Sequence, residues 1–185
     1  RVLFIQFSGF QESIGIASLA ASLERAGHET DLLLMSHCKD LRGELERFRP
    51  GLVGFSALTG GHREITELSR FIKTHTDIPT IIGGPHATYY SEEIAASDNF
   101  DYMCRGEGEE PLVELANRLS RGEKADNIPN IWARTRDGWT RNDLGKLVEV
   151  LDSRPIPKRE IYYKYDFLRK MPLKRFVTGI GCPYP

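Results

Sequence analysis

The sequence lacks three features that would each define a class of protein. Its three cysteines, Cys38, Cys104 and Cys182, are odd in number and widely separated, so they give no disulfide framework and no metal-binding pair. No apolar run approaches the ~20 residues of a membrane span, and the chain opens directly into a strand rather than a signal peptide. Lys and Arg number 25 against 26 Asp and Glu, for a formal net charge of -1. We therefore expect a cytoplasmic protein that binds no nucleic acid or membrane.

Two nucleotide-binding motifs are also missing. The loop after the first strand, residues 8–15, lacks the Gly-x-Gly-x-x-Gly spacing that seats a pyrophosphate on a helix N-terminus. The chain has no Gly-x-x-x-x-Gly-Lys phosphate loop, so phosphoryl transfer is unsupported. A flavodoxin-like carrier of a phosphate cofactor is a weak alternative, because the same loop lacks the hydroxyl- and glycine-rich composition that such a site uses.

Apolar strands alternate with amphipathic helices through the first two thirds of the chain. A chain of 185 residues with 40% hydrophobic content can bury one α/β domain and an appendage. The alternation predicts a doubly wound, five-stranded parallel sheet, flavodoxin-like or Rossmann-like, with strand order 2-1-3-4-5 and helices on both faces. The expected strands are 2–7, 28–34, 51–56, 78–82 and 100–104, and the expected helices are 14–26, 40–48, 62–75, 91–96 and 109–119.

The pattern changes after the predicted domain, which we place at residues 1–126. Residues 130–141 read as a β-hairpin with an Asp-Gly turn. The segment 144–173 has little periodicity, three prolines and a run of aromatic residues, which is typical of a linker that packs across another domain. Residues 127–174 are therefore predicted to form a hairpin and linker, and a new strand begins at about residue 175.

The predicted site lies where the strands end. Ile81 and Ile82 run into Gly83 and Gly84, and such paired glycines at a strand end indicate that something flat or bulky approaches the backbone. With the order 2-1-3-4-5, the loops after strands one, three and four share one rim at the switch point. The candidate binding residues in these loops are Ser8, Gly9, Phe10, Glu12, Gly15, Ser56, Leu58, Thr59, Gly83 and Gly84.

Two further groups on this rim have two interpretations each. His86 follows the paired glycines and either contacts a ligand or stabilises the loop. Gly106, Glu107 and Gly108 precede the last helix, where they form a solvated acidic helix start or line the far side of the same cleft. His62 opens a helix and is interpreted as a cap or surface residue. The other histidines have no cluster partners.

The last residues resemble the start of a radical S-adenosylmethionine domain. Gly181-Cys182-Pro183 follows a strand-like run, and in that family this phrase ends the first barrel strand and opens a Cys-x-x-x-Cys-x-x-Cys motif for a [4Fe-4S] cluster. The resemblance implies that Cys182 is the first metal ligand and that residues 175–185 begin the barrel, which is the partner domain in the parent chain. Because one thiolate cannot hold the cluster, we expect this fragment alone to be inactive.

Residues 1–125 resemble the cobalamin-binding domain that precedes such barrels, most specifically in Ile82–His86 and Arg105–Glu109. Cobalamin domains of the methionine synthase kind carry three sequence motifs, which we call marks. Their Ser-x-Leu mark matches Ser56-Ala57-Leu58, whose hydroxyl would meet the dimethylbenzimidazole tail. Their paired glycines match Gly83-Gly84, which would let the tail slide between strand ends.

The third mark, Asp-x-His-x-x-Gly, is only partly kept. It falls on residues 10–15, where Gly15 remains but Phe10 and Glu12 replace the Asp and the axial His. The resemblance therefore implies cobalamin bound base-off and histidine-off, a state that favours giving a methyl group to a substrate radical. The implied parent is a methyltransferase or a cyclase of the anaerobic magnesium-protoporphyrin ester type, with [4Fe-4S] and S-adenosylmethionine as further cofactors. The alternative is a degenerate domain that binds no cobalamin and covers the barrel, with the Phe10 ring in the path of the tail.

Overall fold

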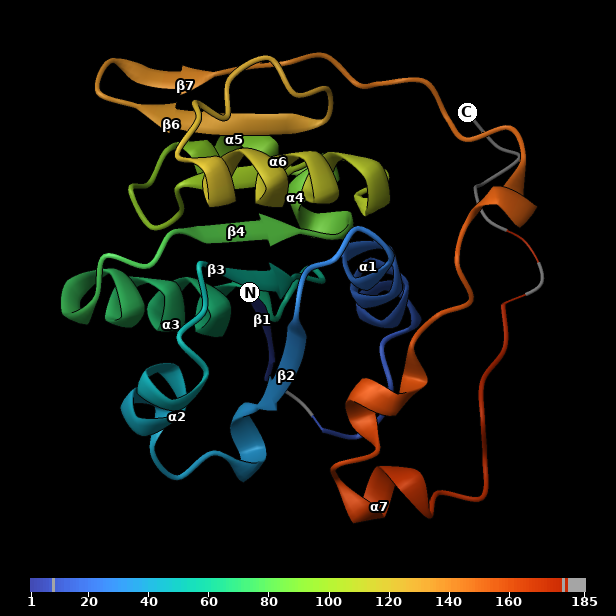
Figure 1. The fold of residues 1–185 in the computed structure, drawn as a ribbon. Coiled ribbons are helices and arrows are strands. Elements are labelled where there is room, and N and C mark those ends of the chain that lie inside the picture. The colour runs from blue at the N-terminus through green and yellow to red at the C-terminus, as the bar shows by residue number, and fades with distance from the viewer. Residues whose placement is uncertain (8, 178, 180–185) are drawn as a thin grey trace.

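The fold is a single mixed β-sheet with helices on both faces (Figure 1). The computed structural model describes residues 1–7, 9–177 and 179. Its strands are β1 (Val2–Gln6), β2 (Thr30–Leu34), β3 (Leu52–Ser56), β4 (Thr80–Gly83), β5 (Tyr102–Cys104), β6 (Ile131–Thr135) and β7 (Gly138–Thr140). The order across the sheet is β2-β1-β3-β4-β5-β6-β7.

The first five strands confirm the predicted α/β fold. They are parallel and lie in the predicted order 2-1-3-4-5. The sheet differs from the prediction in one detail, because β6 pairs antiparallel with β5 and β7 pairs antiparallel with β6. The predicted hairpin therefore extends the sheet to seven strands.

The helices bury two separate cores. One face of the sheet packs against α1 (Ile14–Arg25), α6 (Glu109–Arg121), η3 (Arg159–Tyr162) and α7 (Asp166–Arg169). The other face packs against α2 (Leu41–Phe48), α3 (His62–His75), α4 (Pro85–Tyr89) and α5 (Ser91–Ala95). Two short 3-10 turns, η1 (Met35–His37) and η2 (Leu151–Ser153), complete the elements. The segment after β4, expected to be a loop, forms helix α4 because Pro85 supplies a favourable first residue.

Helix α1 positions one wall of the site. Its Ser13 cap accepts a hydrogen bond from the Ile16 amide at 3.3 Å, which satisfies one of the free amides at the helix start. Ile16, Ala20 and Leu23 recur at helical spacing and are buried against the sheet. The apolar stripe of this helix therefore fixes which side chains it turns toward β1 and β3.

The linker folds back onto the domain. Figure 1 shows the orange and red segment returning beside α1. Tyr162 is fully buried and its hydroxyl donates to Gln6 Oε1 at 2.7 Å. The Lys158 amide donates to the Ala17 carbonyl at 2.9 Å, and the Leu34 amide donates to the Tyr165 hydroxyl at 3.0 Å. The aromatic run, which indicated contact with another domain, thus packs in part on this one.

No helix within residues 1–7, 9–177 and 179 combines the length and the apolar character that crossing a bilayer requires.

If the linker is part of the folded unit, its buried anchor must contribute to stability. We expect Tyr162→Ala to lower the free energy of unfolding by about 3–5 kcal/mol, because it leaves a large cavity. Tyr162→Phe keeps the ring and removes the hydroxyl that donates to Gln6, which should cost about 0.5–1.5 kcal/mol. The control is Tyr89→Ala, at a side chain that is 79% exposed. It should change the free energy of unfolding by less than ~0.5 kcal/mol. Urea denaturation measures all three, and equal losses for Tyr162→Ala and Tyr89→Ala would mean that the linker is not docked.

Candidate cofactor-binding site

A cavity of about 1050 Å³ opens at the carboxyl end of the parallel strands. Its floor is the sheet face formed by Phe4, Gly54 and Ile81, and its walls are α1 and the start of α6. The volume lies just above the ~300–1,000 Å³ range of typical small-molecule sites, which suits a large ligand. Because doubly wound sheets bind ligands at this edge, the cavity lies where the strand order predicts a site.

Gly54 leaves part of the cavity floor without a side chain. A Cβ built on Gly54 would lie 3.1 Å from Cδ1 of Phe4 and 3.7 Å from Cγ2 of Ile81. Glycine in the middle of a buried strand weakens it, and usually marks a place that another group approaches closely. Here it leaves room between α1 and the sheet.

The paired glycines hold the turn after β4 against the end of β3. Gly84 has φ +89°, and a Cβ there would lie 2.9 Å from both the Ala57 carbonyl oxygen and Ser56 Oγ. The Ala57 amide donates to the Gly83 carbonyl at 2.9 Å, and the His86 amide donates to the Ala57 carbonyl at 3.1 Å. Gly84 thus needs to be glycine both for its backbone angle and for this contact.

The loop after β5 forms the opposite wall. Gly106, with φ +70°, donates its amide to Thr88 Oγ1 at 2.9 Å. A Cβ on Gly108 would lie 3.1 Å from Cδ2 of Leu19, so this glycine lets the start of α6 approach α1 closely. Asn130 Nδ2 donates to the Glu107 carbonyl at 2.7 Å, which ties the loop to β6.

The linker forms the roof of the cavity, where residues 151–157 line it in part. Arg154, whose side chain is only 13% exposed, pairs with Glu107 and reaches Glu109 Oε1 at 3.3 Å. The guanidinium compensates both carboxylates, which would otherwise lose solvation in this partly buried place. The acidic loop is therefore an anchor for the roof as well as a wall.

Two residues that line the cavity carry a buried polar atom without a hydrogen-bond partner among the described residues, namely Ser22 at Oγ and Arg154 at Nε. A buried polar group without a partner costs about 1–3 kcal/mol. Burial, with a smaller contribution from Glu109, raises the pKa of the Cys104 thiol to about 12. That thiol therefore stays neutral and adds no charge to the wall.

The predicted site residues divide into three groups. Seven line the cavity, namely Gly15, Ser56, Gly83, Gly84, Gly106, Glu107 and Gly108. Six described residues do not, namely Gly9, Phe10, Glu12, Leu58, Thr59 and His86. Ser8 and Cys182 lie outside the residues that the structure describes.

Two residues of the loop after β1, Phe10 and Glu12, do not line the cavity. Phe10 is 88% exposed and its ring does not fill the cavity. The side chain of Glu12 is only 9% exposed, and it pairs with Lys174 at 2.8 Å and Arg159 at 3.4 Å. The position that the resemblance assigns to an axial histidine thus holds a carboxylate that anchors the linker.

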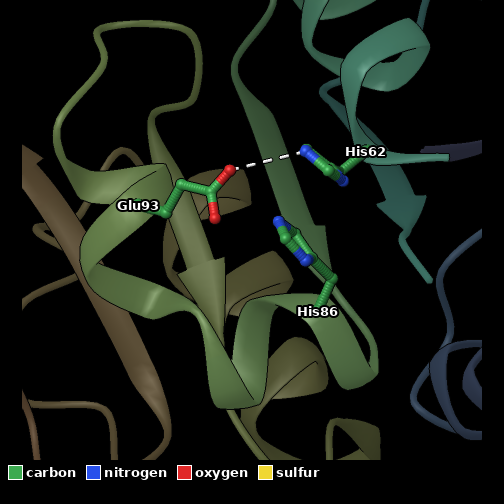
Figure 2. Close-up of side chains that lie close together, drawn as sticks. All are labelled: His62, His86 and Glu93. Carbon is green, nitrogen blue, oxygen red and sulfur yellow. Dashed lines mark ion pairs between the residues drawn. The ribbon is translucent and has the colours of Figure 1, made fainter. Parts of the chain in front are cut away.

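His86 turns away from the cavity toward α3. Its ring stacks on His62 with centroids 4.0 Å apart, and its Nδ1 lies 3.3 Å from Thr59 Oγ1. Figure 2 shows both rings beside Glu93. Burial lowers the pKa of His86, and the neighbouring His62 lowers it further.

Sequence reasoning missed several cavity residues. Ser18 and Ser22 were hidden within an ordinary amphipathic helix, and the roof residues 151–157 lie in a segment without periodicity. Gly54 could have been predicted, because a glycine that interrupts the apolar run of the third strand indicates a close approach to the backbone.

A doubly wound sheet with a cofactor-sized cavity at its switch point belongs to the nucleotide- and cofactor-binding class of α/β domains. The sequence profile of the B12 binding domain matches residues 1–116. The chain belongs to the B12-binding domain family.

The relatives are longer proteins. The chain is 30% identical over 181 residues to hopanoid C-3 methylase of Methylococcus capsulatus, covering 94% of this chain and 34% of that one. It is 28% identical over 182 residues to the uncharacterized methyltransferase PH0819 of Pyrococcus horikoshii, covering 92% of this chain and 39% of the relative. The chain thus spans about a third of the length of these curated relatives.

Two solved structures share the fold. One is the radical S-adenosylmethionine methyltransferase TsrM from Kitasatospora setae with cobalamin and a [4Fe-4S] cluster bound, with TM-score 0.68, 23% identity, and coverage of 84% of this chain and 30% of that one. The other is the cobalamin-dependent S-adenosylmethionine radical enzyme OxsB with aqua-cobalamin and S-adenosylmethionine bound. Its TM-score is 0.74 at 17% identity, and the match covers 88% of this chain and 25% of that one.

A comparison with Gly27 distinguishes the two costs of a side chain at Gly84, namely backbone strain and the clash with the end of β3. Gly27 has the same φ of +89° but open space around its Cβ position, so Gly27→Ala should cost only the left-handed strain, about 1–2 kcal/mol. Gly84→Ala should cost a further ~1–3 kcal/mol from the contact with β3. Thermal or urea unfolding measures the difference, and a Gly84→Ala cost no larger than that of Gly27→Ala would show that the turn is not pressed against β3.

Proposed function

We propose that this chain binds cobalamin with the nucleotide tail in the cavity between α1 and the sheet. The observation that carries the proposal is the cavity itself, at the carboxyl end of the parallel strands, with Gly54 in its floor and Ser18 and Ser22 in its α1 wall. Membership of the B12-binding domain family supports it. Ser56 and Gly84 at the mouth match the residues expected beside the tail. When bound, cobalamin would supply a methyl group carried on cobalt.

The residues present fit a cofactor that is held without a protein nitrogen on its metal. No histidine occurs among the described residues that line the cavity. Glu12 is engaged by two linker cations, and His86 stacks on His62. These contacts support the base-off and histidine-off state.

We further propose that this chain is the cobalamin-binding part of a larger radical S-adenosylmethionine methyltransferase. In this proposal residues 1–126 hold cobalamin, 127–174 form the hairpin and roof, and Cys182 begins the cluster motif of a barrel that also binds S-adenosylmethionine. The two relatives named above are a methylase and a methyltransferase, which favours methyl transfer over cyclisation. The degenerate alternative has lost its main support, because the exposed Phe10 ring leaves the cavity open.

Filling the cavity should block cobalamin. Ser22→Leu adds a branched side chain at a position that lines the cavity, and a clash with the cofactor of ~1.4–2.8 kcal/mol corresponds to roughly 10–100-fold weaker binding. Titration with hydroxocobalamin, followed by visible absorbance, measures the dissociation constant. Ser120→Leu, at an exposed serine of α6, is the control and should bind as the parent does.

The absence of binding in the parent chain would contradict the proposal and favour the degenerate domain. Equal affinities for parent and Ser22→Leu would mean that cobalamin binds elsewhere.

The state of the bound cofactor has a spectroscopic signature. After reduction to cob(II)alamin, the electron paramagnetic resonance spectrum of the complex should lack the splitting that an axial nitrogen causes, because neither the displaced tail nor a histidine reaches cobalt. Free cob(II)alamin at neutral pH, with its tail coordinated, is the positive control. Nitrogen splitting in the complex would show a base-on or histidine-on state instead.

A further inference from the structure

Three potential metal ligands from three helices meet beside the turn after β4. His62 opens α3, His86 lies in α4 and Glu93 lies in α5 (Figure 2). One ligand atom from each lies within 4.8 Å of the other two, and His62 Nε2 is 3.4 Å from Glu93 Oε1. None of the three lines the cavity described above, so this cluster is a separate feature.

The buried member of the cluster has a ring nitrogen without a partner. His86 is 1% exposed, and within the described residues its Nε2 makes no hydrogen bond. Its Nδ1 lies 3.3 Å from Thr59 Oγ1, which can accept the proton of that nitrogen. A metal-bound histidine usually donates its other N–H to such an oxygen, which leaves the free nitrogen as the ligand. The His86 ring is packed between those of His62 and Tyr90, and its partnerless nitrogen lies beside a second imidazole and a carboxylate that can share a metal ion with it.

The outer ligands have room to adjust. The side chain of His62 is 19% exposed and that of Glu93 is 58% exposed. The His62 and His86 rings stack nearly parallel, with an interplanar angle of 14°, and a metal ion must lie in the plane of each imidazole that binds it. The more exposed His62 side chain must therefore turn out of this stack before its Nε2 and that of His86 reach the roughly 3.4 Å separation of tetrahedral zinc ligands. Metal binding at His62 Nε2 moves the ring proton to Nδ1, which gives up the 3.3 Å hydrogen bond from the exposed amide of Gly60.

We propose that His62, His86 and Glu93 bind a divalent transition-metal ion of the zinc class, with water as the fourth ligand. Two imidazoles and one carboxylate are the donors that such ions prefer, whereas Mg²⁺ and Ca²⁺ take mainly oxygen ligands. The ion would join α3 to α4 and α5, and so hold the turn that Gly83 and Gly84 begin. This site does not depend on cobalamin.

Zinc titration of the chain tests the proposal. The protein is purified without a histidine tag, stripped with a chelator and titrated with Zn²⁺ in the absence of cobalamin against a chromophoric competitor. We expect one ion per chain. Since loss of an outer-shell partner costs ~10–100-fold in affinity, His62→Ala should weaken binding by ~100-fold or more and Glu93→Gln by at least ~10-fold. Neither variant removes a buried side chain, so both should fold.

Matched controls distinguish this cluster from other zinc-binding groups. His75→Ala, at the exposed end of α3, and Glu92→Gln, next to Glu93, should bind as the parent does. In the parent chain, zinc should shift the imidazole nitrogen resonances of His62 and His86 and leave those of His75 unchanged. No stoichiometric binding by the parent, or equal binding by His62→Ala through cysteine thiols, would overturn the proposal. In either case, the partnerless nitrogen would be explained by a bridging water.

Discussion

The close approach of the turn after β4 to the end of β3 is the constraint on which the site depends. Gly84 lies where any Cβ would meet Ala57 and Ser56, and hydrogen bonds between Ala57 and both Gly83 and His86 hold the two loops together. This contact places the Ser56 hydroxyl at the cavity, starts α4 immediately after the sheet, and turns His86 toward α3. One backbone contact thus shapes both the cavity and the histidine cluster.

Charge pairs hold the rest of the site in place. The linker reaches the domain through Arg154 on Glu107, Lys158 on Glu24, and Lys174 on Glu12. Surface ion pairs contribute little individually, ~0–1 kcal/mol, but these pairs are partly buried and accompany the packing of Tyr162. These ion pairs hold the linker over the carboxyl ends of the strands, where it forms the roof of the cavity. Glu12, at the position where the resemblance places an axial histidine, is one of these linker anchors.

Sequence patterns within single segments predicted the strands, most of the helices and one wall of the cavity. The alternation of strands and helices gave the five parallel strands and their order, and the paired glycines at 83 and 84 marked one wall of the cavity. Contacts between distant segments left no periodic signal. The pairing of the hairpin with β5 therefore could not be predicted, Ser22 was indistinguishable from other helix residues, and the direction of the Phe10 ring was left open between two hypotheses. His62 was interpreted as a cap because its neighbours, His86 and Glu93, come from two later helices.

Hydrogen–deuterium exchange with and without cobalamin tests most directly whether the tail occupies the cavity between α1 and the sheet. The account predicts that cobalamin slows amide exchange in residues 14–22 of α1 and in the roof residues 151–157, with little change along the body of α3 at residues 65–75. Slower exchange confined to other segments, or no change in α1 and the roof at saturating cobalamin, would contradict it.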